Sequence, residues 1–143
     1  MMTQEMQAKL KRSLILHEGK KSFPYKDSVG KITIGIGYNL SDRGMPDQWI
    51  DQQYNQDVSY FYNQFCENFP WYLELSEDRQ VALVDMAFMG WKKFLTFKKM
   101  IAALAAKDYK QAAMEALHSN WALQVGNRAT TIASVLLNGT YDI

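Results

Sequence analysis

The first 18 positions of the chain carry apolar residues at helical spacing. The members of this stripe lie four residues apart: Met6, Leu10 and Leu14. Residues at this spacing share one face of an α-helix and leave the other face polar. Thr3 is a suitable N-cap residue, and Gly19 suits the position after a helix. The pattern predicts an amphipathic helix over residues 3–18, with Glu18 on its last turn.

Short β-prone runs and glycines follow this helix. The runs Phe23-Pro24-Tyr25 and Ile32-Thr33-Ile34 are typical of strands. Asp27-Ser28-Val29-Gly30 between them is typical of a tight turn. We expect Gly35-Ile36-Gly37 to bend the second strand. These features predict a small antiparallel sheet.

Helical periodicity returns after a polar loop at residues 41–44. Pro46 fits the first position of a helix that continues to about Cys66. A break at Phe69-Pro70-Trp71 follows. Ser76, with two acidic residues behind it, then marks the next helix start.

The C-terminal half is predicted to be helical throughout. The run from Val81 to Trp91 is apolar on nearly every side, which predicts a buried central helix. The remaining apolar runs predict three further helices: 94–105, 108–118 with Asp108 as its cap, and 125–137 closed by Gly139.

This order of elements predicts an α+β fold that is mostly helical, with the sheet segregated near the N-terminus. We expect one domain over residues 1–143 with two lobes. The small sheet lobe covers about residues 19–45. The helical lobe covers about residues 66–143 together with the N-terminal helix 3–18. A helix from about Pro46 would join the lobes, and a cleft between lobes is a usual place for a ligand.

The composition narrows the function classes. With 48% apolar and 22% charged residues, the chain is an ordinary globular protein, and its net charge of +1 argues against a nucleic-acid partner. The single cysteine, Cys66, excludes an internal disulfide. One cysteine and two histidines are too few ligands to predict a metal site, and we expect no cofactor. No run has the length of a signal peptide's apolar segment or of a membrane span.

Glu18, Asp27 and Thr33 are the candidate catalytic residues. Glycoside hydrolysis generally needs two carboxyl groups, one to protonate the leaving oxygen and one to activate water. Glu18 faces the negative end of its helix dipole, which favours it as the protonated acid. Asp27 can stay ionised on a turn, and the Thr33 hydroxyl can hold a water. The spacing alone is also common among surface carboxylates.

The surrounding residues resemble the signature of phage-type lysozymes, glycoside hydrolase family 24. The segments that carry the signature are Glu18-Gly19, Tyr25-Lys26-Asp27, Gly30 and Thr33-Ile34-Gly35-Ile36-Gly37. Further segments resemble the family's inter-lobe helix, central helix and C-terminal part: residues 55–58, 82–88, 127–129 and 139–142. The likeness covers most of the chain, in order, and implies a lysozyme-like two-lobe fold.

The resemblance implies a muramidase. Glu18 would be the general acid, Asp27 would position and activate water, and Thr33 would assist. The substrate would be peptidoglycan, cleaved with inversion at the β-1,4 bond between N-acetylmuramic acid and N-acetylglucosamine in bacterial cell lysis. The candidate substrate-binding or orienting residues are Arg128, Tyr38, Leu40, Asp85 and Phe88.

The family reading also sets expectations about where the protein works. We expect a monomer without stable membrane association. It would be made in the bacterial cytoplasm without a signal peptide. It would act on the cell wall in the periplasm after export, release through a holin, or injection.

Some positions depart from the family pattern. Tyr38 stands where close relatives have a histidine that pairs with the aspartate matching Asp57, and a Tyr38–Asp57 hydrogen bond would replace that pair. The segment between Leu40 and Tyr54 is shorter than in well-known relatives. Asp85 stands where asparagine is expected, and either a hydrogen-bonded carboxylate or a substrate contact would account for it.

Two alternative functions remain open from the sequence. A lytic transglycosylase needs the acid but no second carboxylate, so Asp27 and Thr33 argue against it. A peptidoglycan-binding or scaffold module without turnover is the other alternative. The intact Glu18, Asp27 and Thr33 argue against it, while the change at Tyr38 and the short lobe keep it open.

Overall fold

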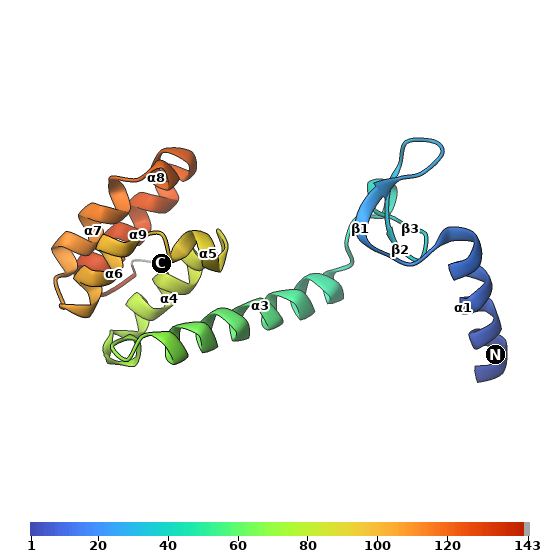
Figure 1. Ribbon diagram of the computed structural model, residues 1–143, viewed down its shortest axis with the longest axis horizontal. Helices are drawn as coiled ribbons and strands as arrows, with labels where there is room; N and C mark the ends of the chain where they lie inside the picture. The colour runs from blue at the N-terminus through green and yellow to red at the C-terminus, as the bar shows by residue number, and fades with distance from the viewer. Residues whose placement is uncertain (142–143) are drawn as a thin grey trace. The chain divides into compact units, whose positions relative to one another are not determined.

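A computed structural model describes residues 1–141, and Asp142 of the C-terminal motif lies outside the described residues. The chain divides into two compact units, residues 1–53 and 54–143, and each is described by itself (Figure 1). The described residues are mostly helical, with one small antiparallel sheet. The expected mostly helical α+β fold is therefore confirmed.

The N-terminal helix α1 runs over Gln4–Glu18. Thr3 caps it, because its hydroxyl oxygen accepts a hydrogen bond from the Met6 amide at 3.1 Å. At the other end Gly19 adopts φ 79° and donates its N–H to the Ile15 carbonyl at 2.8 Å. Both predicted helix ends are confirmed, which places Glu18 as the last helical residue.

The sheet of the first unit has three antiparallel strands in the order β1 (Lys21–Lys26), β2 (Ile32–Gly35) and β3 (Tyr38–Asn39). Thr33, on the central strand, lies opposite Tyr25 on one side and Asn39 on the other. The register is irregular between Lys21 and Tyr25. Pro24 falls in this stretch and has no N–H to donate, which suits an edge strand.

The turn after β2 differs from the expectation. Gly35 and Gly37 have φ values of 68° and 69°, a region that glycine enters without steric cost. The chain therefore reverses into β3 at Gly35-Ile36-Gly37, where we expected only a bend in the second strand.

A short helix, α2 (Leu40–Arg43), replaces most of the predicted polar loop. Asn39 caps it, since its side-chain oxygen accepts from the Asp42 amide at 3.1 Å. The Ser41 hydroxyl oxygen in turn accepts from the Ile32 amide at 2.7 Å. The polarity of this segment suggested a loop. The cap by Asn39 and the hydrogen bond to the central strand stabilise it as a helix.

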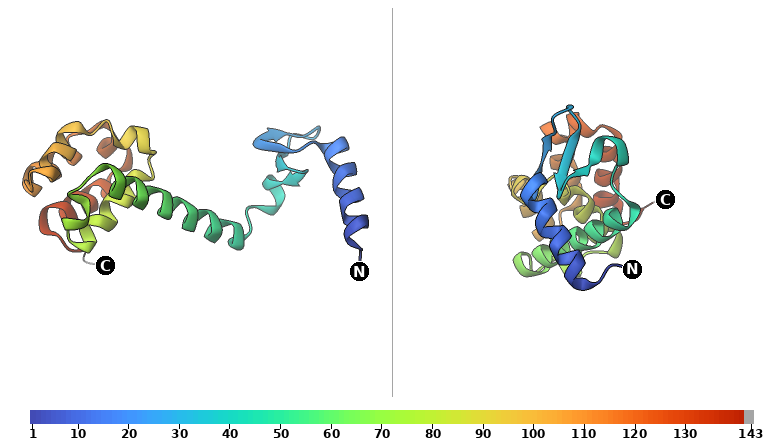
Figure 2. Two further views of the ribbon diagram at one scale, coloured as in Figure 1. Left: turned by 60° about the horizontal axis from the view of Figure 1, so that its bottom comes forward. Right: turned by 90° about the vertical axis from the view of Figure 1, so that its right-hand side faces the viewer.

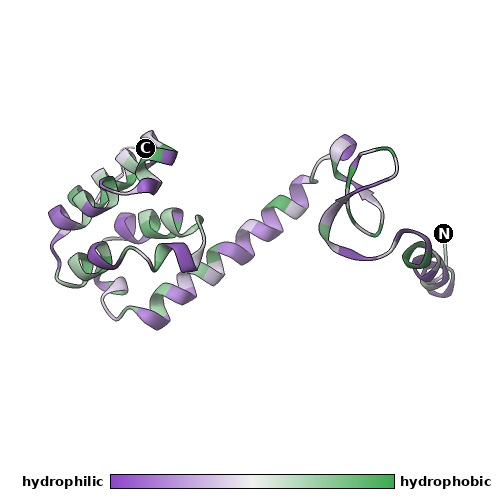
Figure 3. Ribbon diagram, turned by 45° about the horizontal axis from the view of Figure 1, so that its top comes forward, coloured by the Kyte–Doolittle hydropathy of each residue, from purple (hydrophilic) through white to green (hydrophobic). Residues whose placement is uncertain are grey.

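Helix α3 (Asp47–Asn68) belongs partly to each unit. Pro46 precedes it, and the Pro46 carbonyl accepts from the Ile50 amide at 3.1 Å. Proline thus starts the helix as predicted, one residue before its first helical position. Figure 3 shows hydrophilic and hydrophobic residues alternating along this helix.

The second unit is a set of short helices. They are the 3₁₀ helix η1 (Tyr72–Glu74), α4 (Glu77–Ala87), α5 (Trp91–Phe94), α6 (Lys98–Ala105), α7 (Tyr109–Leu117), α8 (Asn120–Val125) and α9 (Asn127–Asn138). The α9 helix contacts both α4 and α7, and Figure 2 shows these segments together. The predicted caps Ser76 and Asp108 each accept a hydrogen bond from the helix that follows.

Three predicted helices are shorter than expected. The predicted central helix 81–91 ends at Ala87, because Gly90 adopts φ 113° and starts α5. The predicted helix 94–105 begins only at Lys98, after Phe97 leaves the helical conformation with ψ 56°. Gly126, with φ 58°, divides the last region into α8 and α9. Within the run 81–91, Val81 and Phe88 are exposed, so this run is not buried on every side.

The hydrophobic core lies in the second unit. All the buried hydrophobic residues that the structure describes fall between Phe65 and Leu136. Phe65 stands among aromatic rings, with the Tyr72 ring stacked at 4.7 Å and the Phe94 ring edge-on at 5.0 Å. The packing of such rings adds to the burial of their large apolar surface. No helix within residues 1–141 has the length and hydropathy of a membrane span.

Hydrogen bonds connect the end of α9 and the residues after it to the start of α4. The Ser76 hydroxyl donates to the Gly139 carbonyl at 2.9 Å, and the Tyr141 amide donates to Asp78 at 2.8 Å. The Arg79 guanidinium donates to the carbonyl of Leu136 at 2.8 Å. These bonds satisfy carbonyl groups that a helix end leaves without partners.

Candidate active site

Glu18 is held at the junction of α1 with the sheet. A Cβ atom placed on Gly37 would lie 3.2 Å from the Glu18 Cγ and 3.4 Å from its Oε2. The Glu18 side chain therefore lies directly against the turn between β2 and β3. The Tyr25 hydroxyl donates to the Glu18 carbonyl at 3.4 Å. Glu18 remains exposed, as a residue that must reach a substrate needs to be.

Asp27 closes the turn between β1 and β2. Its Oδ1 accepts from the Val29 amide at 3.0 Å and from the Lys31 amide at 2.8 Å. Its own amide donates to the Lys31 carbonyl at 2.9 Å, so the ladder of the strands continues to this residue. Both side-chain hydrogen bonds use Oδ1, and within the described residues Oδ2 accepts none. One oxygen thus builds the turn while the other stays available.

Thr33 is the buried polar residue of the central strand. Its side chain is 4% exposed, and its hydroxyl donates to the Lys31 carbonyl at 3.2 Å. A hydroxyl has one proton and two lone pairs. With its proton used in this way, the Thr33 oxygen keeps its lone pairs and can act only as an acceptor toward another group.

The alternation of side chains along a strand predicts that Asp27, one residue past β1, shares a face with Thr33. Side chains of directly opposed residues in an antiparallel pair lie on the same face, and residues two apart on a strand do too. Tyr25 is opposite Thr33, and Asp27 is two residues beyond Tyr25. Through its hydroxyl the same Tyr25 reaches the backbone of Glu18. Tyr25 thus connects two of the predicted catalytic residues, because it pairs with Thr33 in the sheet and reaches the Glu18 carbonyl.

Tyr25 is a site residue that the sequence analysis did not propose. Its signal was present, because a residue two positions before a candidate on a strand shares the candidate's face. The contact of Gly37 with Glu18 had no such signal, since it depends on how the end of α1 meets the turn.

An ion pair supports the strand beside this face. The Lys31 ammonium lies 2.9 Å from Asp42 Oδ1. The hydrogen bond from Lys31 lowers the pKa of the Asp42 carboxyl, and the same bond raises the pKa of Lys31. The pair links α2 to Lys31. The Lys31 amide donates to Asp27, and the Lys31 carbonyl accepts from Thr33.

Tyr38 and Leu40 lie on the far side of the turn. The Tyr38 hydroxyl donates to the Gly44 carbonyl at 2.6 Å. A hydroxyl has only one proton, and the expected hydrogen bond to Asp57 would need the same one. The Tyr38 ring packs against Trp49 at 4.8 Å, with the Arg43 guanidinium 4.3 Å from its centre. Leu40 is half-buried at the start of α2. Both residues therefore hold α2 in place, and their contact with a substrate stays a prediction.

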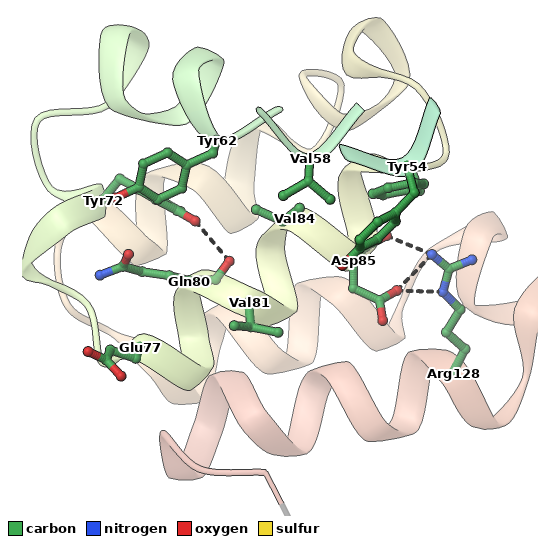
Figure 4. A pocket seen from close by; sticks show the side chains of 11 residues that line it. Tyr54, Val58, Tyr62, Tyr72, Glu77, Gln80, Val81, Val84, Asp85 and Arg128 are labelled. Atoms are coloured by element: carbon green, nitrogen blue, oxygen red, sulfur yellow. Dashed lines mark hydrogen bonds and ion pairs between the residues drawn. The ribbon is translucent and has the colours of Figure 1, made fainter. Parts of the chain in front are cut away.

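The second unit has a groove of about 820 Å³ (Figure 4). It contains three of the predicted binding or orienting residues: Asp85, Phe88 and Arg128. Its apolar wall includes Val58, Val81 and Val84. Burial raises the pKa of the Tyr72 hydroxyl, which donates to the Gln80 carbonyl at 2.9 Å. The groove is thus mainly apolar, with polar groups at a few points.

Asp85 and Arg128 form an ion pair at this groove, and Figure 4 shows the two groups facing one another. The Arg128 Nε and Nη2 atoms lie 2.8 and 2.7 Å from Asp85 Oδ1. Nη2 also donates to the Asp85 carbonyl at 2.6 Å. These contacts give the Asp85 carboxylate a structural role, because they hold the start of α9 against α4. The substrate-binding or orienting role expected of Arg128 stays a prediction.

The predicted site residues thus fall into two groups. The first unit holds Glu18, Asp27, Thr33, Tyr38 and Leu40. The second unit holds Asp85, Phe88 and Arg128. Among residues 1–141, no group of three or more His, Cys, Asp or Glu side chains is arranged to hold a metal ion.

Comparison with known proteins gives three findings. Residues 16–134 match the protein family described as Phage lysozyme. The probable T4-type lysozyme 1 of Dictyostelium discoideum is 27% identical over 168 residues, which cover 96% of this chain and 98% of the relative. The probable T4-type lysozyme 2 of the same organism is 28% identical over 165 residues, which cover 94% of this chain and 97% of that protein.

A relative of a different kind is the pre-baseplate central spike protein Gp5 of Enterobacteria phage T4. It is 27% identical over 114 residues, which cover 79% of this chain but only 18% of that protein. The shared segment is therefore one part of a longer chain there.

Proposed function

Because the chain belongs to the phage lysozyme family, we propose that it is a muramidase-type peptidoglycan hydrolase with Glu18 as its general acid. The bond cleaved is the β-1,4 bond between N-acetylmuramic acid and N-acetylglucosamine. The observation that carries the proposal is that Tyr25, two residues before Asp27, pairs with Thr33 in the sheet and reaches the Glu18 carbonyl. Glu18 and Asp27 supply the two carboxyl groups. Glycoside hydrolysis needs such a pair of carboxyl groups.

The role that we propose for each residue is supported by the hydrogen bonds of the site. Glu18 gives its proton to the leaving glycosidic oxygen. A water donates one proton to Asp27 Oδ2, the oxygen that the turn does not use, and the other to the Thr33 hydroxyl oxygen. The lone pair of this water then points away from the sheet, toward the sugar. Asp27 takes up the water's proton as the new C–O bond forms.

This arrangement supports attack by water on the face of the sugar opposite the leaving group. Such attack inverts the anomeric carbon, so the β-linked substrate would release an α-anomer first. Proton NMR of the product in the first minutes of the reaction distinguishes the two anomers. A β-anomer as the first product would contradict the role given to Asp27.

The decisive experiment compares wild type with Glu18→Gln on purified Gram-negative peptidoglycan. Glu5→Gln is the matched control, because Glu5 lies on the same helix and pairs with Lys9 at the surface. We expect Glu18→Gln to fold normally and to lose about 10²–10⁴-fold in activity, the usual contribution of general acid catalysis. Turbidity clearing measures the rate, and mass spectrometry identifies the released muropeptides.

The products also separate the alternative functions. Ordinary reducing-end products from wild type and Glu5→Gln alone would support the hydrolase. Anhydro-sugar products would make the protein a lytic transglycosylase. Binding of folded wild type to peptidoglycan without any clearing would make it a binding or scaffold module. Full activity of Glu18→Gln would show that Glu18 is not the acid.

A further inference from the structure

The turn between β2 and β3 contains two glycines with nearly the same positive φ. Gly35 and Gly37 have φ values of 68° and 69° and flank Ile36. Both positions disfavour a side chain to a similar degree for backbone reasons alone. They differ in what surrounds them.

A side chain at Gly35 would meet open space, while one at Gly37 would meet Glu18. No heavy atom lies within 4 Å of a Cβ placed on Gly35. On Gly37 the same atom would lie 3.2 Å from Glu18 Cγ, 3.4 Å from its Cβ and 3.4 Å from its Oε2. The Glu18 side chain therefore rests along the bare backbone of Gly37.

The contact involves the part of Glu18 that is hardest to move. Cβ and Cγ are fixed by the backbone and the first side-chain torsion, whereas the carboxyl end can rotate. The backbone of this helix end is itself held, because the Gly19 amide donates to Ile15 at 2.8 Å and the Tyr25 hydroxyl donates to the Glu18 carbonyl. A side chain at Gly37 would have to be relieved by a new Glu18 rotamer or a shift of the helix end.

We propose that Gly37 is a positioning residue that sets the place of the Glu18 carboxyl. It acts by contact with the stem of Glu18, and the missing side chain is what allows the stem and the carboxyl to lie against the turn between β2 and β3. The effect on turnover rests on the proposed function. The contact itself does not, so the two are tested separately.

The contact is tested by stability, with Gly35→Ala as the matched control. We expect Gly35→Ala to lower the melting temperature of the first unit by about 2–4 °C through backbone strain. Gly37→Ala should lower it further by a similar amount. Glu18→Ala removes Cγ and the carboxyl, so in that background Gly37→Ala should cost no more than Gly35→Ala. An undiminished difference between the two alanine variants would overturn the contact.

The positioning role is tested by kinetics on soluble peptidoglycan fragments. A displacement of catalytic atoms by a few tenths of an ångström lowers the rate without removing binding groups, so we expect Gly37→Ala to lower kcat about tenfold. Its KM should stay within about twofold, and Gly35→Ala should keep kcat within about twofold. Equal kcat values for the two alanine variants would overturn the positioning role.

The two tests also distinguish this inference from the proposed function. If wild type proves inactive, the proposed function fails, while the stability cycle and the ¹³C signal of the Glu18 carboxyl still report the contact. In that case a Glu18 carboxyl signal that moves in Gly37→Ala but not in Gly35→Ala supports the contact. An unmoved signal in both overturns it.

Discussion

At the residue scale, Asp27 has a role in the turn and, in the proposed mechanism, a separate role toward water. Its Oδ1 holds two amides of the turn, while Oδ2 is available for the water. Asparagine keeps an oxygen that can accept the same two amide bonds, but it cannot take up a proton from water. Alanine can do neither. Substitution at this one position therefore separates folding from chemistry.

We predict that Asp27→Asn and Asp27→Ala lose activity alike and stability unequally. Both should lose about 10²-fold or more in turnover, because neither side chain acts as a base. Asp27→Ala should also lose about 1–3 kcal/mol of unfolding free energy with its two hydrogen bonds, and Asp27→Asn should keep most of it. Urea unfolding and turbidity clearing measure the two effects. Wild-type turnover by Asp27→Asn would contradict the base assignment.

At the element scale, the Lys31–Asp42 pair ties α2 to the central strand, and this tie depends on pH. The folded-state pKa of Asp42 lies below its ordinary value because Lys31 donates to it. The stabilisation is present above the ordinary carboxyl range, near pH 4, and disappears as the pH falls through the lowered value. The pKa of Lys31 is raised, so its contribution is lost only as the pH rises through that raised value, above about 10.4.

We predict that Asp42→Asn makes the first unit less sensitive to acid. Between pH 7 and pH 2 its stability should fall less than that of wild type, and at pH 7 it should be the less stable protein. The amide NMR signals of Ile32 and Thr33 follow the unit during urea unfolding at each pH. Asp51→Asn, at the start of α3, is the control for loss of a carboxylate. Parallel pH curves for wild type and Asp42→Asn would contradict the prediction.

Side-chain caps were predictable from the sequence, while internal helix breaks were not. Thr3, Ser76 and Asp108 were identified as caps because their side chains bond locally to the backbone. The break at Gly90 falls inside an apolar run, and periodicity continues across a glycine whether or not it takes a positive φ. Gly126 lies at the edge of the predicted helix 125–137, where the sequence did not show the separate helix α8 before it. The strands that carry Tyr25 and Thr33 were predictable from the sequence motif. The contact of Gly37 with Glu18 was not, because it depends on how the end of α1 packs against the turn between β2 and β3.

At the scale of the whole molecule, the core and the candidate catalytic residues lie in different units. The buried hydrophobic residues of the described structure belong to the second unit, whereas Glu18, Asp27 and Thr33 belong to the first. Thr33 is the buried residue of the first unit. Local stability increases with the number of buried apolar contacts, so the candidate catalytic residues lie on the less stable part of the chain.

We predict that hydrogen exchange separates the two units in the intact chain. Amides of α4 and α9, which pack together in the core, should exchange slowest. Amides of β1 and β2 should exchange at least about tenfold faster, because few apolar contacts oppose their opening. Exchange followed by NMR gives the rate for each amide. Equal protection of sheet and core would contradict this order.

The fastening of α9 to α4 also bears on the order of events during protein synthesis. Ser76 and Arg79 receive their partners from Leu136 and Gly139, which are translated some sixty residues later. The first unit, by contrast, makes its sheet from neighbours in sequence. On the ribosome, the apolar side of α4 stays exposed until α9 has emerged. In the nascent chain, the part that carries Glu18 can therefore take shape first, and the part that carries the core is completed last.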